Sequence, residues 1–256
     1  MKAIILSAGQ GSRLGSLTAA RPKCLIEFAG RSLLDRQLDT LDACGVDEVV
    51  VVTGFRDDQV EAALARRIGG PRVRTLFNPF YKVADNLGSL FIAREELEGE
   101  VLVWNGDTLV SEALMARVLA NQAHRGICVT IDRKARYDDD DMKVVVDDGD
   151  GRLRAIGKRI AKGVNAESIG LLAFRGDGAG RFRHAIERAM RTSEGTTIWY
   201  LRVIHHLAQN GVVGTFDISG EGWGEVDFPE DIPGAEALCA GWDALRGTQV
   251  KKAAAA

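Results

Sequence analysis

The first residues of the chain have types and a spacing that suit phosphate binding. An apolar strand expected at residues 3–6 leads into a loop that contains Gly9 and Gly11. Glycine has no Cβ, so the backbone can bend sharply and its N–H groups can approach a polyanion closely. Arg13 and Lys23 bring positive charge within reach. The pattern predicts a phosphate-binding loop at the carboxyl end of the first strand.

Two common phosphate loops do not match this segment. A P-loop has four residues between its glycines and then Gly-Lys-Ser/Thr, whereas Gly9 and Gly11 are separated by one residue. The dinucleotide fingerprint has a third glycine where Leu14 stands, and an acidic residue about 20 positions later at a strand end. Asp35 and Asp39 fall in a helical pattern instead. Taken alone, the glycine pair is equally compatible with an ordinary tight turn.

Composition excludes several classes of protein. The chain has 256 residues, 46% of them apolar and 27% charged, with a net charge of −3, so it has no general attraction to nucleic acid. It contains no apolar run long enough for a bilayer and no signal-peptide pattern. Four scattered cysteines suggest neither a zinc site nor a disulfide framework. We expect a cytoplasmic protein with small-molecule substrates, no membrane partner, and a homodimer as an open possibility.

Hydrophobic periodicity predicts an α/β organisation. In the first half, strands expected at residues 3–6, 48–53, 73–77 and 101–104 alternate with helices at 33–44, 57–67 and 88–97. This alternation indicates right-handed crossovers and a parallel sheet. Short strands at 127–133, 143–148 and 153–156 indicate an antiparallel insert. A strand at 168–174, helices at 177–191 and 197–209, a strand at 213–217 and a last helix from Pro229 to about Arg246 complete the chain.

Two aspartates follow strands at positions suited to a metal ion. Asp107 comes directly after the strand at 101–104, with Gly106 providing the bend. Ligands of parallel sheets bind at this edge, and a carboxylate is a hard ligand that suits Mg²⁺. The alternative is an ordinary Asn-Gly-Asp turn. Asp227 lies between a short strand and the helix that begins at Pro229.

The longer N-terminal pattern resembles the nucleotidyltransferase signature. Residues 9–14, followed by Pro22-Lys23, are similar to the motif of enzymes that join an NTP to a phosphate monoester, the sugar-nucleotide pyrophosphorylase type. The resemblance implies a Rossmann-like, mostly parallel mixed sheet flanked by helices, with a small antiparallel insert. It implies one domain over residues 1–246, with a nucleotide-binding half (1–125), an acceptor-binding half (126–246) and a tail at 247–256.

The same resemblance assigns roles to individual residues. Arg13, Lys23 and Lys158 are the expected catalytic cations, and Asp107 and Asp227 together hold the expected cofactor, Mg²⁺. Glu225 is not assigned, because it shares the face of Asp227 only if the segment stays extended. Asp231 is expected to serve a helix N-terminus. The residues assigned to the nucleotide are Leu6, Ala8, Gly9, Gln10, Gly11, Ser12, Arg13, Lys23, Asn86, Gly88, Ser89, Asn105 and Gly106.

Within the family, the stretch at residues 84–90 is most similar to choline- and phosphonate-activating cytidylyltransferases. Their pattern is Asn-Asn-x-x-Ser-Leu, which Asn86 and Ser89 match in part, while Asp85 replaces the first Asn and Gly88 intervenes. Asn and Ser can distinguish a pyrimidine's amine from its carbonyl by paired hydrogen bonds. The alternative for Asn86 is a helix N-cap.

The acceptor-binding residues lie in the second half of the chain. The stretch at 138–145 resembles the Asp-x-Asp-Met-Lys-Val segment of phosphocholine-type cytidylyltransferases, although a charge run is usually a solvated loop. Aromatic faces attract quaternary ammonium groups, but core packing is their commoner fate. The residues expected to contact the acceptor are Asp141, Lys143, Glu167, Trp199, Tyr200 and Trp223.

The resemblance implies a Mg²⁺-dependent reaction of CTP with a phosphorylated amino alcohol or a phosphonate. An acceptor oxygen attacks the α-phosphorus in line, and pyrophosphate leaves. Positioning and charge neutralisation then provide most of the rate acceleration. Two alternatives stay open: a sugar-1-phosphate nucleotidyltransferase that uses UTP, dTTP or GTP, and a non-catalytic nucleotide-binding regulatory module. A dinucleotide-binding domain is disfavoured by the broken fingerprint.

Overall fold

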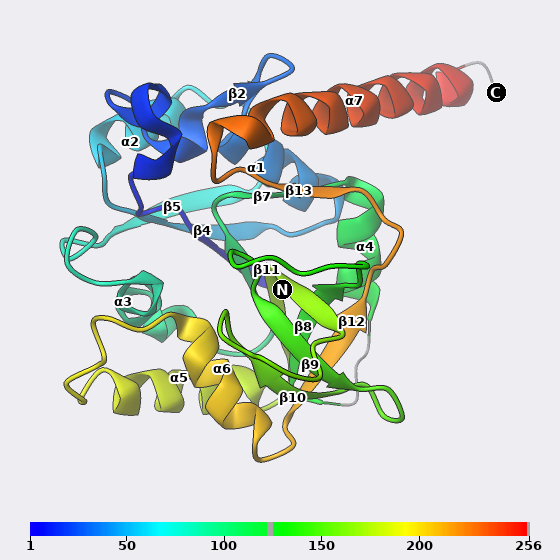
Figure 1. Ribbon diagram of the computed structural model, residues 1–256. Helices are drawn as coiled ribbons and strands as arrows, with labels where there is room; N and C mark the ends of the chain where they lie inside the picture. The colour runs from blue at the N-terminus through cyan, green and yellow to red at the C-terminus, as the bar shows by residue number, and fades with distance from the viewer. Residues whose placement is uncertain (122–124, 255–256) are drawn as a thin grey trace.

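The computed structural model describes residues 1–121 and 125–254, the last six of these by their backbone alone. A mixed sheet runs through the molecule in the order β5-β4-β1-β6-β11-β8-β12-β10-β9 (Figure 1). Its strands are β1 (Lys2–Leu6), β4 (Glu48–Thr53), β5 (Arg72–Phe77), β6 (Val101–Asn105), β8 (Ile127–Asp132), β9 (Lys143–Asp147), β10 (Arg152–Ile156), β11 (Ala166–Phe174) and β12 (Val213–Asp217).

The sheet changes from parallel to antiparallel pairing at β11. Strands β5, β4, β1 and β6 are parallel, whereas β11 runs antiparallel to β6 and to β8, and β9 and β10 form an antiparallel pair. This confirms the expected mixed α/β fold with an antiparallel insert. In the register of β1 and β6, Leu6 lies opposite Asn105, so the loops that follow these two strands leave the sheet side by side.

Helices cover both faces of the sheet (Figure 1). Apolar side chains of α3 (Asn86–Ile92), α5 (Gly178–Ala189) and α6 (Tyr200–Ala208) pack on one face, and those of α1 (Leu33–Ala43), α2 (Asp57–Ala65) and α4 (Glu112–Ala120) pack on the other. Strand β1 is apolar throughout because both of its faces are covered. A third, smaller core lies where α7 (Ile232–Ala254) packs on the hairpin of β2 (Glu27–Phe28) and β3 (Arg31–Ser32).

Several elements differ from the sequence-based expectation. Helix α4 was not expected, although Ser111 caps it by accepting a hydrogen bond from the Leu114 N–H, which is a recognisable start signal. Helix α7 continues to Ala254, beyond the expected end near Arg246 and into the expected tail. Helix α3 begins two residues earlier than expected and gives way after Ile92 to a short 3₁₀ turn.

One unexpected pairing matters for the site. Strand β7 (Thr108–Val110) pairs antiparallel with β13 (Trp223–Glu225), and Glu225 lies opposite Thr108. This two-stranded ribbon brings the segment around Asp227 next to the turn that carries Asp107, across more than a hundred residues of sequence.

None of the helices in the described residues is long and apolar enough to span a bilayer.

Candidate active site

The loop after β1 folds over the side chain of Lys23. Gly11 has φ +73°, and a Cβ at this position would lie 2.9 Å from the Lys23 Cβ. A side chain here would be strained by the backbone and would collide with the lysine stem. The Thr18 hydroxyl donates a hydrogen bond of 2.8 Å to the Gly11 carbonyl and fixes the end of the loop. Glycine at this position therefore lets a cation lie directly beneath a loop of exposed small residues.

Three carboxylates converge beside this lysine. Asp107, Glu225 and Asp227 each offer an oxygen within 4.8 Å of the others. Asp107 follows β6, and a Cβ at Gly106 would lie 2.4 Å from the Leu6 carbonyl oxygen, so only glycine allows the turn to approach β1 this closely. Oδ1 of Asp107 is buried and has no hydrogen-bond partner in the described structure. Hard carboxylate oxygens, one of them unpartnered, are the donor set that suits Mg²⁺.

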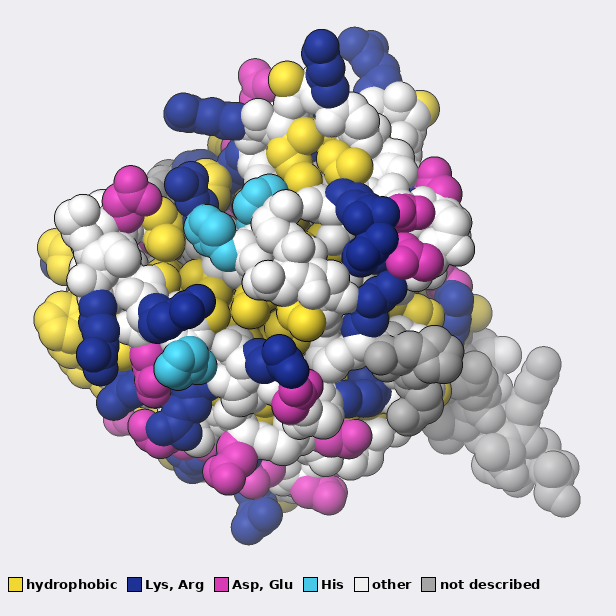
Figure 2. All heavy atoms as spheres, turned by 90° about the horizontal axis from the view of Figure 1, so that it is seen from below, with side chains coloured by type: hydrophobic (Ala, Val, Ile, Leu, Met, Phe, Trp, Pro, Cys, Tyr) yellow, Lys and Arg dark blue, Asp and Glu magenta, His cyan; other side chains and the backbone are white. Residues whose placement is uncertain are grey.

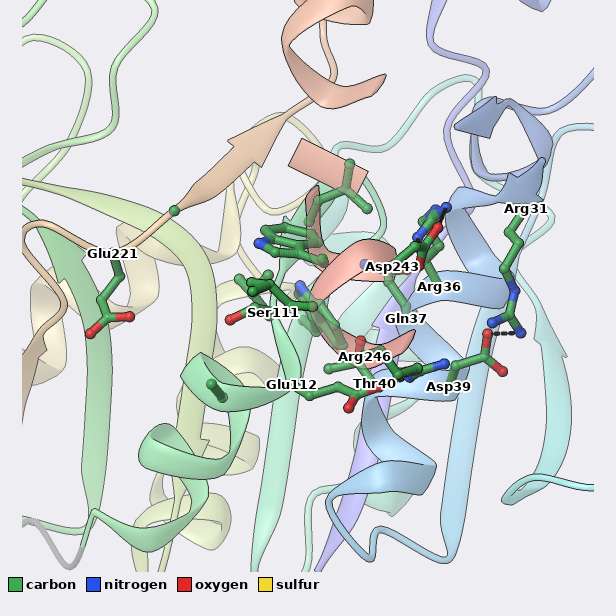
Figure 3. A pocket seen from close by; sticks show the side chains of 17 residues that line it. Arg31, Arg36, Gln37, Asp39, Thr40, Ser111, Glu112, Glu221, Asp243 and Arg246 are labelled. Atoms are coloured by element: carbon green, nitrogen blue, oxygen red, sulfur yellow. Dashed lines mark hydrogen bonds and ion pairs between the residues drawn. The ribbon is translucent and has the colours of Figure 1, made fainter. Parts of the chain in front are cut away.

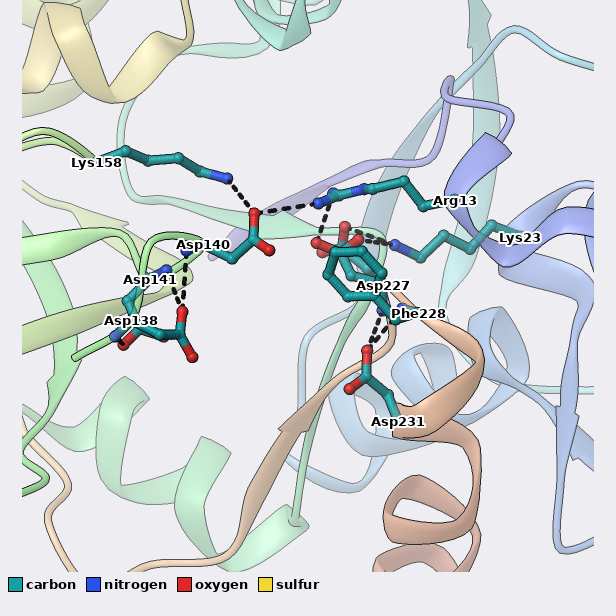
Figure 4. Close-up of polar contacts among 10 residues, drawn as sticks. Arg13, Lys23, Asp138, Asp140, Asp141, Lys158, Asp227, Phe228 and Asp231 are labelled. Carbon is teal, nitrogen blue, oxygen red and sulfur yellow. Dashed lines mark hydrogen bonds and ion pairs between the residues drawn. The ribbon is translucent and has the colours of Figure 1, made fainter. Parts of the chain in front are cut away.

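The expected cations meet these carboxylates (Figure 4). Lys23 Nζ donates to Oδ1 of Asp227 at 2.6 Å and to Oδ2 of Asp107 at 3.0 Å, and Arg13 Nη2 donates to Oδ2 of Asp227 at 2.6 Å. From the segment that precedes β9, Asp140 lies 3.6 Å from Arg13 and 3.3 Å from Lys158. The three expected catalytic cations and the expected metal pair therefore form one continuous ionic network.

Titration shifts reflect this crowding. Burial alone would lower the pKa of the Lys23 ammonium, but Asp107 and Asp227 outweigh it and raise that pKa. For Asp227, burial acts to raise the pKa of the carboxyl, and Lys23 and Arg13 reverse this and lower it. Desolvation, followed by repulsion from the two aspartates, raises the pKa of Glu225.

Glu225 was set aside in the sequence analysis and belongs to this cluster. Strand β13 ends at Glu225, and an oxygen of Glu225 lies within 4.8 Å of oxygens of Asp107 and Asp227. Asp231 has the role expected of it, since its Oδ2 accepts the N–H groups of Asp227 and Phe228 at 2.7 Å each and caps the turn before α7 (Figure 4). Its carboxylate is therefore committed to the backbone.

A buried glutamine that the sequence analysis missed holds the Asp107 turn in place. Nε2 of Gln37 donates to the carbonyls of Asn105 at 2.8 Å and Thr108 at 3.0 Å, one on each side of the turn. Gln37 stands on the apolar face of α1, between Leu34 and Leu38, and is 1% exposed. A polar residue within an apolar helical stripe is the signal that identifies such a position.

Gln37 also lines a cavity of about 330 Å³ between α1, α4 and α7 (Figure 3). Its charged lining residues pair with one another, as Arg36 does with Asp243 at 2.8 Å. None of the phosphate-loop residues or the three clustered carboxylates lines it. The cavity therefore lies outside the candidate active site.

A second cavity, of about 510 Å³, lies between the phosphate loop and α3. Five of the residues expected to bind nucleotide line it, namely Leu6, Ala8, Gly9, Asn86 and Ser89. Gln10, Ser12 and Arg13 are exposed on the loop beyond it. Gly88 and Asn105 do not line this cavity: a Cβ at Gly88 would lie 2.7 Å from the Ala84 Cβ, and the Asn105 side chain accepts a hydrogen bond of 3.0 Å from the Tyr200 hydroxyl.

The structure decides what caps α3. Asp85, not Asn86, is the N-cap, and its carboxylate accepts the Asn86 N–H at 2.7 Å. Oδ1 of Asn86 instead accepts the Tyr200 N–H at 2.9 Å and satisfies the first turn of α6. The alternative role of Asn86 as the cap of its own helix is therefore wrong. Its Nδ2 group is the part of the side chain left to meet a ligand in the cavity.

The residues expected to contact the acceptor are separated by the structure. Tyr200 is completely buried and packs in the core, which corrects the expectation that it faces an acceptor. Trp223 donates from its indole to Asp132 at 2.8 Å and packs against the core cluster beneath α4. Trp199 remains 40% exposed, and the Lys158 ammonium lies 5.2 Å from its ring centroid. For Tyr200 and Trp223, core packing was the correct alternative.

The remaining acceptor candidates already have partners within the protein. The Lys134 ammonium bridges Asp141 at 2.8 Å and Glu167 at 2.9 Å. Lys143 is buried and donates to the carbonyl oxygens of Lys158, at 3.1 Å, and of Asp138. These contacts stabilise the insert and leave no uncompensated carboxylate among the expected head-group ligands.

Comparison with known proteins agrees with this geometry. Residues 3–201 match the family model described as the MobA-like NTP transferase domain. The chain belongs to this family. The expected resemblance to nucleotidyltransferases, and to their cytidylyltransferase branch, is thereby confirmed.

Two relatives of this chain are named as a phosphonate synthase and as a bifunctional transferase and synthase. A CMP-5'-(3-aminopropyl)phosphonate synthase of Streptomyces rubellomurinus is 32% identical over 90% of this chain and 37% of its own length. A bifunctional IPC transferase and DIPP synthase of Rubrobacter xylanophilus is 31% identical over 94% of this chain and 52% of its own. The chain thus spans between about a third and a half of these relatives.

The solved structures show the same fold. A CTP:phosphocholine cytidylyltransferase from Streptococcus pneumoniae superposes with a TM-score of 0.78 at 22% identity, covering 93% of this chain and 98% of that protein. The expected nucleotide-diphospho-sugar-transferase-like architecture is confirmed by this match.

Proposed function

We propose that this chain is a Mg²⁺-dependent cytidylyltransferase. It couples CTP to a phosphorylated amino alcohol or a phosphonate and gives a CDP- or CMP-linked product and pyrophosphate. The observation that carries the proposal is the convergence of Asp107 and Asp227 on Lys23, directly beneath the phosphate loop. Both carboxylates are expected for nucleotidyl transfer, whereas a module that only senses nucleotide needs no such pair.

Each residue has a role in the proposed reaction. The loop amides with Arg13 and Lys23 bind the triphosphate, and Lys158 orients the acceptor oxygen toward the α-phosphorus. That oxygen forms the new bond to phosphorus while the bond to the β-phosphate bridging oxygen breaks, and the electron pair leaves with pyrophosphate. Asp107 and Asp227 would hold Mg²⁺, which when bound supplies charge neutralisation at the phosphates. Charged groups that are already held in place lower the activation barrier of the reaction most when water is excluded from the site.

The choice of CTP rests on the relatives and on the second cavity. Two of the similar proteins are named for CMP or CTP chemistry. The Nδ2 group of Asn86 and the carboxylate of Asp85 lie at the cavity beside the loop, where they supply a donor and an acceptor for a pyrimidine edge. The four free cysteines agree with action in a reducing compartment such as the cytoplasm.

The proposal is tested by pyrophosphate release from CTP, UTP, dTTP and GTP. Each nucleotide is combined with Mg²⁺ and with phosphocholine, phosphoethanolamine, 2-aminoethylphosphonate or a hexose 1-phosphate. We expect turnover with CTP and an amino-alcohol phosphate or a phosphonate. Turnover only with a hexose 1-phosphate and a nucleotide other than CTP would indicate a sugar-1-phosphate nucleotidyltransferase instead.

A pair of variants tests the metal assignment. Asp107→Asn is expected to abolish turnover while its circular dichroism and melting temperature stay close to those of the parent chain. The matched control is Glu230→Gln, an exposed carboxylate close to the site. It should retain parental rates. Near-parental pyrophosphate release from Asp107→Asn would contradict the metal role.

A further inference from the structure

A third cavity opens beside Lys158, and its walls are amphiphilic. It has a volume of about 1020 Å³ and lies between the end of β10, the segment at residues 157–160 and the start of α6. Its apolar walls are formed by Met142, Ile156, Ile160, Ile198, Trp199 and Leu201. Figure 2 shows this underside of the molecule, where lysine, arginine and histidine side chains border exposed apolar ones.

The polar lining of this cavity is strongly cationic. Lys143, Lys158, Arg159 and Arg202 line it beside the imidazoles of His205 and His206, and Asp139 is the single acidic residue that does so. This excess is local, because the whole chain has a net charge of −3. A concave surface with one sign of charge concentrates ligands of the opposite sign.

Two of these cations have no close carboxylate partner. Across the described residues, Arg159 makes no ion pair, and the nearest carboxylate to Arg202 is Glu194 at 3.9 Å. Most other arginines close to the cleft are committed, as Arg13 is to Asp227 at 2.6 Å. Guanidinium groups suit a carboxylate because they can donate two parallel hydrogen bonds.

The cavity begins where the proposed reaction takes place. Lys158 lines it and also reaches Asp140, which lies against Arg13 in the network of the active site. Arg159 is the next residue along the chain. Arg202 lies one helical turn from Trp199, since its N–H donates to the Trp199 carbonyl at 2.9 Å. An acceptor whose phosphate meets Lys158 would share this cavity with the guanidinium groups of Arg159 and Arg202.

The same surroundings are poorly suited to a purely cationic head group. The Lys158 ammonium already lies over the exposed Trp199 ring, and Lys134 forms ion pairs with both Asp141 and Glu167. A trimethylammonium group would thus meet cations rather than a free aromatic face. Among the charged residues that line the cavity, cations outnumber the single carboxylate, which favours an acidic group on the acceptor.

We propose that the acceptor carries a carboxylate in addition to its reacting phosphate or phosphonate, and that Arg159 and Arg202 bind this carboxylate. This inference rests on the proposed function and specifies its acceptor. The substrate class is an amino acid that bears a phosphate ester or a phosphonate, not a choline-type phosphate.

Matched substrate pairs test the proposal. O-phosphoserine differs from phosphoethanolamine by one carboxylate, and 2-amino-3-phosphonopropionate differs in the same way from 2-aminoethylphosphonate. With CTP and Mg²⁺, kcat/KM for the carboxylated member of at least one pair should exceed that of its partner about tenfold or more, as expected for a charge-assisted contact. The double variant Arg159→Met/Arg202→Met should lose this preference and keep the parental rate with the partner lacking the carboxylate.

The control is Arg181→Met, an exposed arginine of α5 on the same face but outside the cavity. It should preserve the preference. Equal or higher kcat/KM for the partners lacking the carboxylate, or an unchanged preference in the double variant, would overturn the proposal and leave the cytidylyltransferase function intact.

Calorimetric binding to the full chain separates the two hypotheses further. O-phosphoserine should bind more tightly than phosphoethanolamine, and the double variant should abolish the difference. If no acceptor releases pyrophosphate from CTP, the proposed function fails, while this binding comparison still decides the role of the cavity. Equal affinities of the two ligands would refute it.

Discussion

Replacing Lys23 by methionine tests the electrostatics of the site most directly. The ammonium lies 2.6 Å from Asp227 and 3.0 Å from Asp107, and the lysine side chain is 11% exposed. Lys23→Met keeps an apolar stem beneath Gly11 and removes only the charge. Without the ammonium, the clustered carboxylates repel one another in a poorly solvated place.

The expected loss of stability follows from this geometry. Removing one partner of a buried ion pair costs about 3–5 kcal/mol. Asp227 keeps its contact with Arg13, so we expect the lower end of this range, about 3 kcal/mol. In a chain of this size, about 2–4 °C of melting temperature corresponds to 1 kcal/mol. Lys23→Met should therefore melt roughly 6–12 °C below the parent chain at pH 7.5.

The loss should depend on pH and on Mg²⁺. Burial opposes ionisation of Asp227, but Lys23 and Arg13 lower the pKa of its carboxyl below the ordinary value. A carboxyl shifted down stabilises the fold above its unfolded pKa and loses that contribution as the pH falls through its folded pKa. The difference between variant and parent should thus shrink in acid. Mg²⁺ should raise the melting temperature of the variant more than that of the parent, because it replaces the missing charge.

Thermal unfolding with EDTA or with Mg²⁺ measures these effects. The control is Lys162→Met, which removes an exposed lysine and should leave the melting temperature within about 1–2 °C of the parent value. Turnover of Lys23→Met at saturating Mg²⁺ should fall by about 10²–10³. Equal melting temperatures of Lys23→Met and the parent without metal, or no selective effect of Mg²⁺, would refute the electrostatic reasoning.

Three further substitutions follow from single observations. Gln37→Leu removes both hydrogen bonds to the turn that carries Asp107. We expect kcat to fall and the Mg²⁺ concentration that gives the half-maximal rate to rise. The affinity for CTP without metal, measured by equilibrium binding, should stay unchanged. Gly11→Ala places a Cβ at φ +73° against Lys23 and should cost about 1–3 kcal/mol in denaturant unfolding and weaken CTP binding. For Glu96, desolvation is outweighed by Lys2 and a neighbouring arginine, which lower the pKa of its carboxyl. Glu96→Gln should therefore be less stable by up to about 1 kcal/mol at pH 7, and this difference should vanish near pH 3 in urea titrations.

The parts of the site within one short segment were predictable from sequence. The loop around Gly11, the turn at Asp107 and the capping aspartate Asp231 each depend on neighbours a few residues away. The end of a strand and the residues of the following turn identify each of these positions, because the same few residues determine both the backbone bend and the functional side chain. The parallel half of the sheet was predictable for the same reason, since buried parallel strands are apolar throughout.

Residues that act through distant pairing were not predictable in this way. Glu225 joins the carboxylates only because β13 pairs with β7 and stays extended. Gln37 holds a turn about seventy residues away, and its one local signal is a polar side chain on the apolar face of a helix. Neither contact follows from spacing along the chain.

The residue at which α6 begins determined the outcome of the predictions for Trp199 and Tyr200. Trp199 is the N-cap and points outward, and Tyr200 is the first helical residue and is completely buried. A shift of one residue at a helix start reverses which neighbour faces the core, and helix boundaries are the least certain feature of a sequence pattern. Trp199 therefore remained near the cleft while Tyr200 packed against Asn105.

The charges around Lys23 bear on how the proposed metal and triphosphate would bind together. Arg13 and Lys23 now neutralise Asp227 and Asp107. A triphosphate that draws these cations away leaves the carboxylates uncompensated, and a divalent cation that takes the carboxylates leaves the two side-chain cations unpaired. In the proposed reaction both changes are compensated only when the nucleotide and the metal bind together. The network of cations and carboxylates would therefore favour the complete substrate complex over either component.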